Sequence, residues 1–196
     1  MTISLHRMSL KPTVSPIASD RPLVCMGDVW GRADVECVLD TGALIEWPLD
    51  QLRAGLCAVS QMSEVERHSP ERALILESQG PVFATPRPES TESAHEAATV
   101  SGDISGLSAV DVDVLALALE SGLPLVTDDY RLQNVCESAG HAWRPAVTQG
   151  ITERWNWQLV CTGCGSVAPA ASAPSKSRGD HGNCADCGAG LRLRRA

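Results

Sequence analysis

Residues 107–129 read LSAVDVDVLALALESGLPLVTDD, and this stretch decides the fold class. Ser108 is a favourable N-cap for the apolar helix that follows it, and Gly122 is a typical helix stop. The run LPLV is then a short buried strand that ends at Asp128 and Asp129. The next residues, YRLQNVCESAG, predict another helix.

The same alternation extends toward the N-terminus. VECVLD (35–40) predicts a strand that ends at Asp40, followed by a helical stretch over 41–55 that Pro48 interrupts. Residues 57–69 predict a strand end and a helix capped by Ser60, and Ser69-Pro70 begins a further helix. Residues 85–103 predict a Pro-rich loop that becomes a helix.

Strands that alternate with helices predict an α/β fold, with a parallel sheet covered by helices on both faces in three layers. In such sheets, functional groups gather beyond the carboxyl ends of the strands. Asp40 and the Asp128/Asp129 pair both follow predicted strands there.

Charge is unevenly distributed in this chain of 196 residues and net charge −8. Residues 37–150 carry 17 acidic and 6 basic side chains, whereas 151–196 carry 3 acidic and 6 basic ones. The overall charge therefore does not indicate nucleic-acid binding, which would depend on local basic residues, aromatic side chains and metal ions. With no long apolar run and no secretory signal pattern, we expect a soluble cytoplasmic protein.

Four of the eight cysteines form two Cys-x-x-Cys pairs near the C-terminus, separated by 19 residues. This spacing predicts one structural Zn²⁺ bound by four thiolates, with paired redox thiols as the alternative. The predicted ligands are Cys161, Cys164, Cys184 and Cys187. The ion would fold a segment too short and too poor in apolar residues to build its own core. The other cysteines, at 25, 37, 57 and 136, are expected to be small apolar residues.

A dispersed set of acids is the second candidate site, formed by Asp40, Glu64, Asp111 and Asp129, with Asp128 adjacent. Several carboxylates that converge on Mg²⁺ or Mn²⁺ are what metal-dependent phosphodiester cleavage requires. Each acid also has a simpler explanation. Asp111 completes a capping box with Ser108, Glu64 is a plausible exposed helix residue, and the Asp pair suits a turn.

Four stretches in order, CVLDTGALI, SEVERHS, SGDISGLSAVDVDVLALALE and LVTDDYRLQNV, resemble the motifs of PIN-domain ribonucleases. The third motif and the QNV sequel are most similar to the archaeal Nob-type rRNA maturation endonucleases, in which a zinc ribbon follows the PIN domain. The resemblance implies a PIN domain over 37–145 and a rubredoxin-like zinc ribbon with a basic end over 146–196. Residues 1–36 form an irregular extension with no assigned role.

By this resemblance, the chain is a metal-dependent endoribonuclease that cleaves precursor small-subunit rRNA at its 3′ end. Asp40, Asp111 and Asp129 would bind Mg²⁺ or Mn²⁺, with Asp128 as helper. Glu64 would bind metal or position water, although Glu66 lies close in sequence. Thr127 would orient a ligand or cap the next helix, and Asn134 would be structural. Gly42 stands where relatives often carry Ser, so one hydroxyl is missing.

RNA contact is expected from aromatic and basic residues around the ribbon, namely Arg154, Trp155, Trp157, Arg192, Arg194 and Arg195. The alternative for the two tryptophans is that they cover the ribbon core or the seam between domains. The expected partners are precursor rRNA and the assembling small subunit, with neither a membrane nor a small-molecule cofactor. Two other functions stay open: a toxin-type PIN ribonuclease acting on other RNAs, and a non-catalytic RNA-binding assembly factor.

Overall fold

The computed structural model describes residues 35–153, 155–169 and 181–196. They belong to a compact unit that begins at Arg32. The predictions made for residues 1–34 and for Arg154 lie outside the described residues. Within the described part, no helix has both the length and the apolar character needed to cross a membrane.

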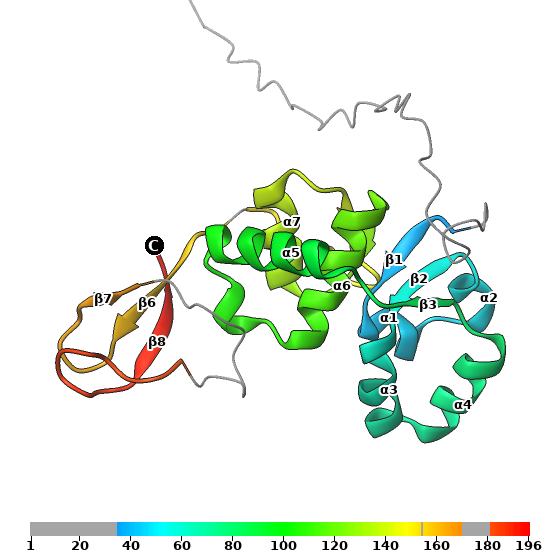
Figure 1. The fold of residues 1–196 in the computed structure, drawn as a ribbon, viewed down its shortest axis with the longest axis horizontal. Helices are drawn as coiled ribbons and strands as arrows, with labels where there is room; N and C mark the ends of the chain where they lie inside the picture. Colours follow the sequence, from blue (N-terminus) through cyan, green and yellow to red (C-terminus); the bar gives the residue numbers. More distant parts are fainter. Residues whose placement is uncertain (1–34, 154, 170–180) are drawn as a thin grey trace, which may run out of the picture. The chain divides into compact units, whose positions relative to one another are not determined.

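A five-stranded parallel sheet forms the centre of the fold (Figure 1). Its strands lie in the order β3-β2-β1-β4-β5. Their bounds are β1 Cys37–Leu39, β2 Gly55–Ala58, β3 Val82–Ala84, β4 Leu125–Val126 and β5 Trp143–Arg144. After β1 the chain adds β2 and then β3 on one side of it. The chain then crosses to the other side of β1, where it forms β4 and β5. The sheet therefore has a topological switch point between β1 and β4.

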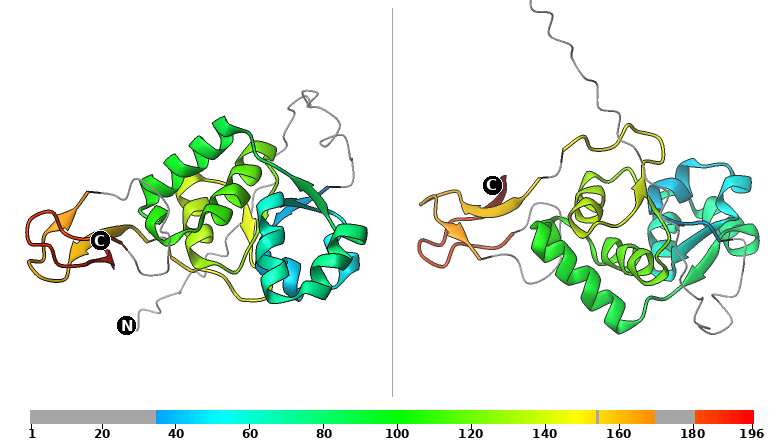
Figure 2. Two further views of the ribbon diagram at one scale, coloured as in Figure 1. Left: turned by 60° about the horizontal axis from the view of Figure 1, so that its bottom comes forward. Right: turned by 90° about the horizontal axis from the view of Figure 1, so that it is seen from above.

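In the described part of the chain, seven helices connect and cover these strands. They are α1 Thr41–Glu46, α2 Leu49–Leu52, α3 Met62–His68, α4 Pro70–Gln79, α5 Pro88–Ser101, α6 Ala109–Ser121 and α7 Tyr130–Ala139. Two short 3₁₀ turns, η1 Val59–Gln61 and η2 Ile104–Gly106, precede α3 and α6. Helices α5, α6 and α7 pack on one another and form one group in two views (Figures 1 and 2).

Both faces of the sheet are covered, as the sequence predicts. Cys37 and Leu39 of β1 belong to a buried cluster with Leu44 of α1, Val65 of α3 and Leu76 of α4. Successive strand residues point to opposite faces, so the fully buried Val38 between them faces the other way. Helix α6 packs against β1 and β2 on that side.

Most predicted helix ends are confirmed. Ser108 caps α6, Gly122 ends it with a φ of 69°, and Ser69 caps α4 with Pro70 in its first turn. The N-cap prediction for Ser60 is wrong, because β2 runs directly into η1 and Ser60 lies within that turn. Strands β3 and β5 were not predicted, since each has only two or three residues and little alternation.

A three-stranded antiparallel sheet follows, in the order β7-β6-β8. Its strands are β6 Trp157–Cys161, β7 Val167–Ala168 and β8 Leu191–Arg195. Strand β6 ends at the first Cys-x-x-Cys pair, as predicted. The first sheet ends at Arg144 and the second begins at Trp157, while the domain boundary near residue 145 stays a prediction.

Candidate functional site

The carboxyl ends of β1 and β4 meet at the switch point. The register pairs Val38 with Leu125 and Leu39 with Val126, so the residues that follow, Asp40 and Thr127, leave the sheet side by side. This is the edge where parallel α/β sheets place their ligands. The position of the site thus follows from strand order rather than from any one motif.

Asp40 is held at this edge by two hydrogen bonds. Its Oδ1 accepts from the backbone N–H of Thr41 at 2.6 Å, which caps α1. Its Oδ2 accepts from the hydroxyl of Thr127, also at 2.6 Å. Asp40 is only 8% exposed, so both bonds form in a largely dry environment. One lone pair on each oxygen still remains for another partner.

Asp129 and Asp111 reach the same edge from two helix N-termini. Asp129 caps α7 by accepting from the N–H of Arg131 at 2.7 Å, and its own N–H donates to the Thr127 hydroxyl. Asp111 and Ser108 form the predicted capping box, in which Asp111 Oδ2 accepts from the Ser108 N–H at 2.7 Å. Asp129 and Asp111 therefore both cap helices. In the hydrogen bonds of the described residues, capping uses one carboxylate oxygen of each acid.

Glu64 approaches the same edge from α3. Its Oε2 accepts from the Thr41 hydroxyl at 3.0 Å. The amide of Gln61 donates to that same hydroxyl oxygen at 3.3 Å and to the carbonyl of Leu39 at 3.1 Å. Glu66 is exposed. The structure therefore brings Glu64, and not Glu66, to the edge where Asp40 lies.

The acids influence one another electrostatically. The pKa of Asp40 is raised to about 6, mainly by burial and also by the negative charges of Asp111 and Asp129, against hydrogen bonds from Thr127 and Thr41 that lower it. Burial likewise raises the pKa of Asp111, where Asp129 and Glu64 add to the effect. Like charges held together in a poorly solvated place are a setting that a cation would stabilise.

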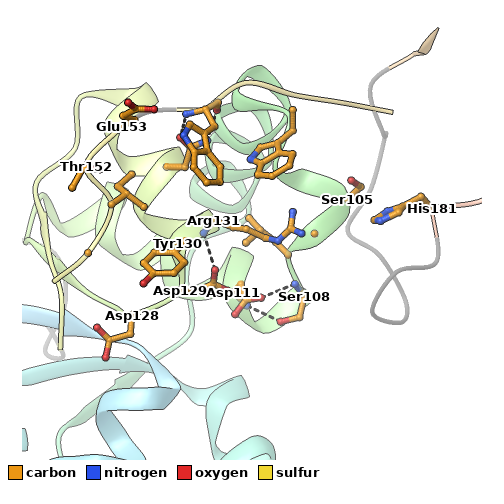
Figure 3. Close-up of a pocket in the computed structure, with 17 residues that line it drawn as sticks. Ser105, Ser108, Asp111, Asp128, Asp129, Tyr130, Arg131, Thr152, Glu153 and His181 are labelled. Carbon is orange, nitrogen blue, oxygen red and sulfur yellow. Dashed lines mark hydrogen bonds between the residues drawn. The ribbon is translucent and has the colours of Figure 1, made fainter. Parts of the chain in front are cut away.

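Asp128 is turned away from these acids (Figure 3). Its carboxylate accepts hydrogen bonds from the backbone N–H groups of Ala146, Val147 and Thr148 and from the Thr148 hydroxyl. Despite slight desolvation, these bonds lower its pKa. The prediction that Asp128 helps to bind the catalytic metal does not agree with this geometry, because its oxygens hold the 146–148 loop instead.

The neighbouring acid Asp113 is half-buried and accepts from the Ser60 hydroxyl at 2.8 Å.

The four cysteines of the two Cys-x-x-Cys pairs form a metal-ligating cluster. Their Sγ atoms all lie within 4.8 Å of one another. Cys161 Sγ is 3.3 Å from Cys187 Sγ, and Cys164 Sγ is 3.7 Å from Cys184 Sγ. Tetrahedral Zn²⁺ with ordinary Zn–S bonds sets sulfur atoms about 3.8 Å apart, so the spacing fits. Among the described residues, no group of carboxylates converges as closely as these thiols.

The turn that carries Cys161 and Cys164, the first knuckle, has a backbone geometry that favours metal binding. The N–H groups of Gly163 and Cys164 donate to Cys161 Sγ at 3.3 and 3.4 Å. With the Cys164 N–H as the largest cause, they lower the pKa of Cys161 to about 6, which favours the thiolate. At Gly163 a Cβ would lie 2.8 Å from that of Ala189, so the knuckle has no room for a side chain.

A pocket of about 1120 Å³ opens beside Asp111 and Asp129. Tyr130, Trp155 and Trp157 are among the residues that line it. The rings of Trp155 and Trp157 meet edge to face, with centroids 5.6 Å apart, so the two share one side of the chain.

Asn134 fixes the chain that carries these rings. Its side-chain Oδ1 accepts from the Trp155 N–H and its Nδ2 donates to the Trp155 carbonyl, both at 2.6 Å. The same Nδ2 donates to Asp103 at 2.7 Å. The expectation that Asn134 is structural agrees with these contacts.

Comparison with known proteins places this arrangement in a family. Residues 37–120 match the family described as the PIN domain of ribonuclease. Ribonuclease VapC1 of Thermoplasma acidophilum is 33% identical over 133 residues, which cover 67% of this chain and 69% of that protein. The chain belongs to the PIN-domain ribonuclease family.

The PIN domain here is also similar to archaeal proteins named Endoribonuclease Nob1, which confirms the Nob-type resemblance. Identity is 39% with the protein of Methanothermobacter thermautotrophicus, over 43% of this chain and 52% of the relative. It is 36% with that of Pyrococcus abyssi, over 55% of this chain and 62% of the relative. The chain thus spans between half and two thirds of the length of these two relatives.

Two PIN-domain residues at the site were missed in the sequence. Thr41 supplies a hydroxyl beside Asp40 although Gly42 does not, and Gln61 holds that hydroxyl in place. The Asp-Thr dipeptide at residues 40–41 is the feature of the sequence from which the role of Thr41 could be predicted. Gln61 had none, because its role depends on η1 folding back over the end of β1.

The predicted RNA-contact residues divide into two groups. Alternation along β8 separates Arg192 and Arg194 from Arg195. Arg195 lies over the Trp155 ring at 5.0 Å and pairs with Glu153 at 3.0 Å. All three arginines are exposed.

Proposed function

We propose that this protein is a metal-dependent endoribonuclease that cleaves precursor small-subunit rRNA at its 3′ end. The observation that carries the proposal is the set of four acids that meet at the switch point. They come from four separate elements: Asp40 after β1, Glu64 in α3, Asp111 in α6 and Asp129 before α7. Family membership supports RNA as the substrate class, and the names of the Nob1 relatives support endonucleolytic cleavage. The ribosomal substrate is what the Nob-type resemblance of the motifs implies.

The chemistry of the donor set fits Mg²⁺ or Mn²⁺. Asp40, Asp111 and Asp129 offer carboxylate oxygens, which these hard cations prefer, and Glu64 lies where it would bind metal or orient water. A bound divalent ion would supply an activated water and neutralise charge at the scissile phosphate.

The chain's own contribution is to hold the acids in place. The threonine hydroxyls at 41 and 127 fix one oxygen of Glu64 and one of Asp40, so that the remaining lone pairs face the same edge.

For the C-terminal cluster we propose Zn²⁺ as the ion and folding of the ribbon as its role. Four thiolates form a closed tetrahedral site with no open position, which is the arrangement of structural zinc. The cysteine cluster lies between β6 and β8. These strands have few apolar side chains, so the sheet would not be stable without the bound metal.

The assembling small ribosomal subunit is the proposed partner, and a cytoplasmic location remains a prediction. A non-catalytic assembly factor would not need the acids held in this way. A PIN ribonuclease acting on other RNAs would not need the cysteine cluster.

The decisive experiment is cleavage of an RNA that spans the mature 3′ end of small-subunit rRNA, with Mn²⁺ or Mg²⁺ added and EDTA as the metal-free arm. We expect a single cut at the mature end that disappears with EDTA and in Asp40→Asn. Asp50→Asn is the matched control, because Asp50 is an exposed acid in α2. Tight RNA binding without cutting in any metal would instead support the non-catalytic assembly factor. Cuts spread over unrelated RNAs with equal efficiency would contradict the ribosomal substrate.

A further inference from the structure

The pocket beside the acids lies on one side of them only. Asp111 and Asp129 line it, whereas Asp40 and Glu64 do not. From Asp129 the lining continues through Tyr130 and Arg131 at the start of α7 to Trp155 and Trp157. An RNA strand bound at the acids would therefore meet a shaped surface in one direction along its backbone.

Aromatic rings are the distinctive part of that surface. Tyr130 is 55% exposed and Trp155 is 39% exposed. The backbone of Trp155 is fixed, because Asn134 bonds both its N–H and its carbonyl. An exposed ring on a fixed backbone offers a stacking surface for which part of the ordering cost is met before binding.

The charges of the pocket favour a base over a phosphate. Asp111, Asp128, Asp129 and Glu153 all line it, and among the described lining residues only Arg131 carries a permanent positive charge. Away from the proposed metal ligands Asp111 and Asp129, the carboxylates of Asp128 and Glu153 would repel a phosphate, whereas a neutral base brings amino groups that carboxylates accept.

Two polar groups on the pocket wall lack partners among the described residues. The Ser105 hydroxyl is buried, in a residue only 3% exposed, and has no hydrogen bond. The Nη1 atom of Arg131 is also buried without a hydrogen bond. The Arg131 guanidinium lies 5.6 Å from the Trp157 ring and packs so closely on Gly106 that a Cβ there would lie 2.0 Å from Nη1. Buried polar groups of this kind require a partner, and a base edge offers both donors and acceptors.

We propose that this pocket is a stacking subsite for one or two unpaired nucleobases on one side of the scissile phosphate. The inference rests on the proposed ribonuclease activity and adds a direction to it. Substrate recognition at the active site is one-sided, so unpaired nucleotides matter on one side of the cut and not on the other.

The test uses the full chain and short RNAs trimmed stepwise from each end around the cut. We expect removal of unpaired nucleotides on one side to raise KM roughly fivefold to a hundredfold for each stacked base that is lost, with kcat nearly unchanged. Trimming the other side should change KM less than about twofold. Trp155→Ala should raise KM for the longer RNAs and abolish the effect of trimming, and Trp155→Phe should restore most of it.

Val167→Ala is the matched control, because Val167 is a 61% exposed apolar residue of the ribbon outside the pocket lining. Zinc content of each variant shows whether the ribbon stays folded. Equal effects of trimming from both ends, or a wild-type KM in Trp155→Ala, would overturn the subsite. If wild-type protein cuts no RNA, the proposed function fails. Quenching of Trp155 fluorescence by the same RNAs, measured against Trp155→Phe, then decides the subsite separately.

Discussion

The hydroxyl of Thr127 at the end of β4 donates a 2.6 Å hydrogen bond to Oδ2 of Asp40 at the end of β1. The Thr127 hydroxyl oxygen in turn accepts from the N–H of Asp129 at 3.0 Å. One buried hydroxyl thus ties together two acids that lie far apart in the sequence. Of the two roles predicted for Thr127, the structure shows contacts that orient the site acids, whereas the cap of α7 is Asp129.

Thr127→Val should therefore lower both stability and cleavage. The substitution keeps the shape but leaves the Asp129 N–H and Asp40 Oδ2 without their partner, at a cost of about 1–3 kcal/mol in the free energy of unfolding. We expect kcat to fall at least about tenfold, since misplaced ligands weaken metal binding. Urea unfolding and single-turnover cleavage measure the two effects. Thr148→Val, which removes an exposed hydroxyl bonded to Asp128, should change neither appreciably.

Asp40→Asn should make the metal-free protein more stable above pH 6 while abolishing cleavage. The pKa of folded Asp40 is about 6 against an ordinary value of 3.8, so the unfolded chain releases this proton first. Stability of the wild-type protein therefore falls as pH rises from about 4 to about 6, by up to roughly 3 kcal/mol from this group. In EDTA, the two proteins should unfold alike near pH 4 and diverge by pH 8. Parallel curves of stability against pH for the wild-type protein and Asp40→Asn would show that the charge of Asp40 does not destabilise the folded protein.

Glu64→Gln should reduce kcat at least about tenfold, while Glu66→Gln should leave it unchanged. The reason is position, because Glu64 bonds Thr41 beside Asp40 and Glu66 points to solvent. Cleavage assays over a range of Mn²⁺ concentrations separate weaker metal binding from slower chemistry. The reverse ranking of the two variants would assign the helix acid to Glu66.

Cys184→Ser should remove the ribbon's metal and unfold its sheet without unfolding the PIN domain. Structural zinc sites contribute about 10–16 kcal/mol to folding, far more than the three short strands β6, β7 and β8 supply. Zinc content should fall from one equivalent to nearly none, with rapid hydrogen exchange in 157–161 and slow exchange retained in 125–126. Cys136→Ala changes a buried cysteine of α7 outside the cluster and should retain the metal. Full zinc content in Cys184→Ser would rule out the four-thiolate site.

Asn134→Ala should free the segment that carries Trp155. It removes three hydrogen bonds of the side chain, to both polar groups of the Trp155 backbone and to Asp103, and should cost about 2–4 kcal/mol in stability. Exchange of the Trp155 amide should accelerate strongly, and RNA affinity should fall. In Asn134→Asp, a second carboxylate faces Asp103, so the loss should be larger at pH 8 than at pH 5. Slow Trp155 exchange in Asn134→Ala would show that other contacts hold this segment.

The fold class and both chemical clusters followed from the sequence because their signals are local. Helix α6 is predicted by its N-cap Ser108, its apolar run and the terminal Gly122. The cysteine spacing by itself predicts a four-ligand metal site. The motif order identified the acids, since Asp40, Asp111 and Asp129 each sit at a fixed point of a strand end or helix start.

Tertiary structure alone decided which neighbours take part in the site. Asp128 and Asp129 are adjacent in sequence, but successive residues leaving a strand point in different directions, so one holds the 146–148 loop and the other joins Asp40. Thr41 and Gln61 acquired their roles only when η1 met the end of β1. Contacts between elements distant in the chain depend on packing in three dimensions, which no local pattern of residues encodes.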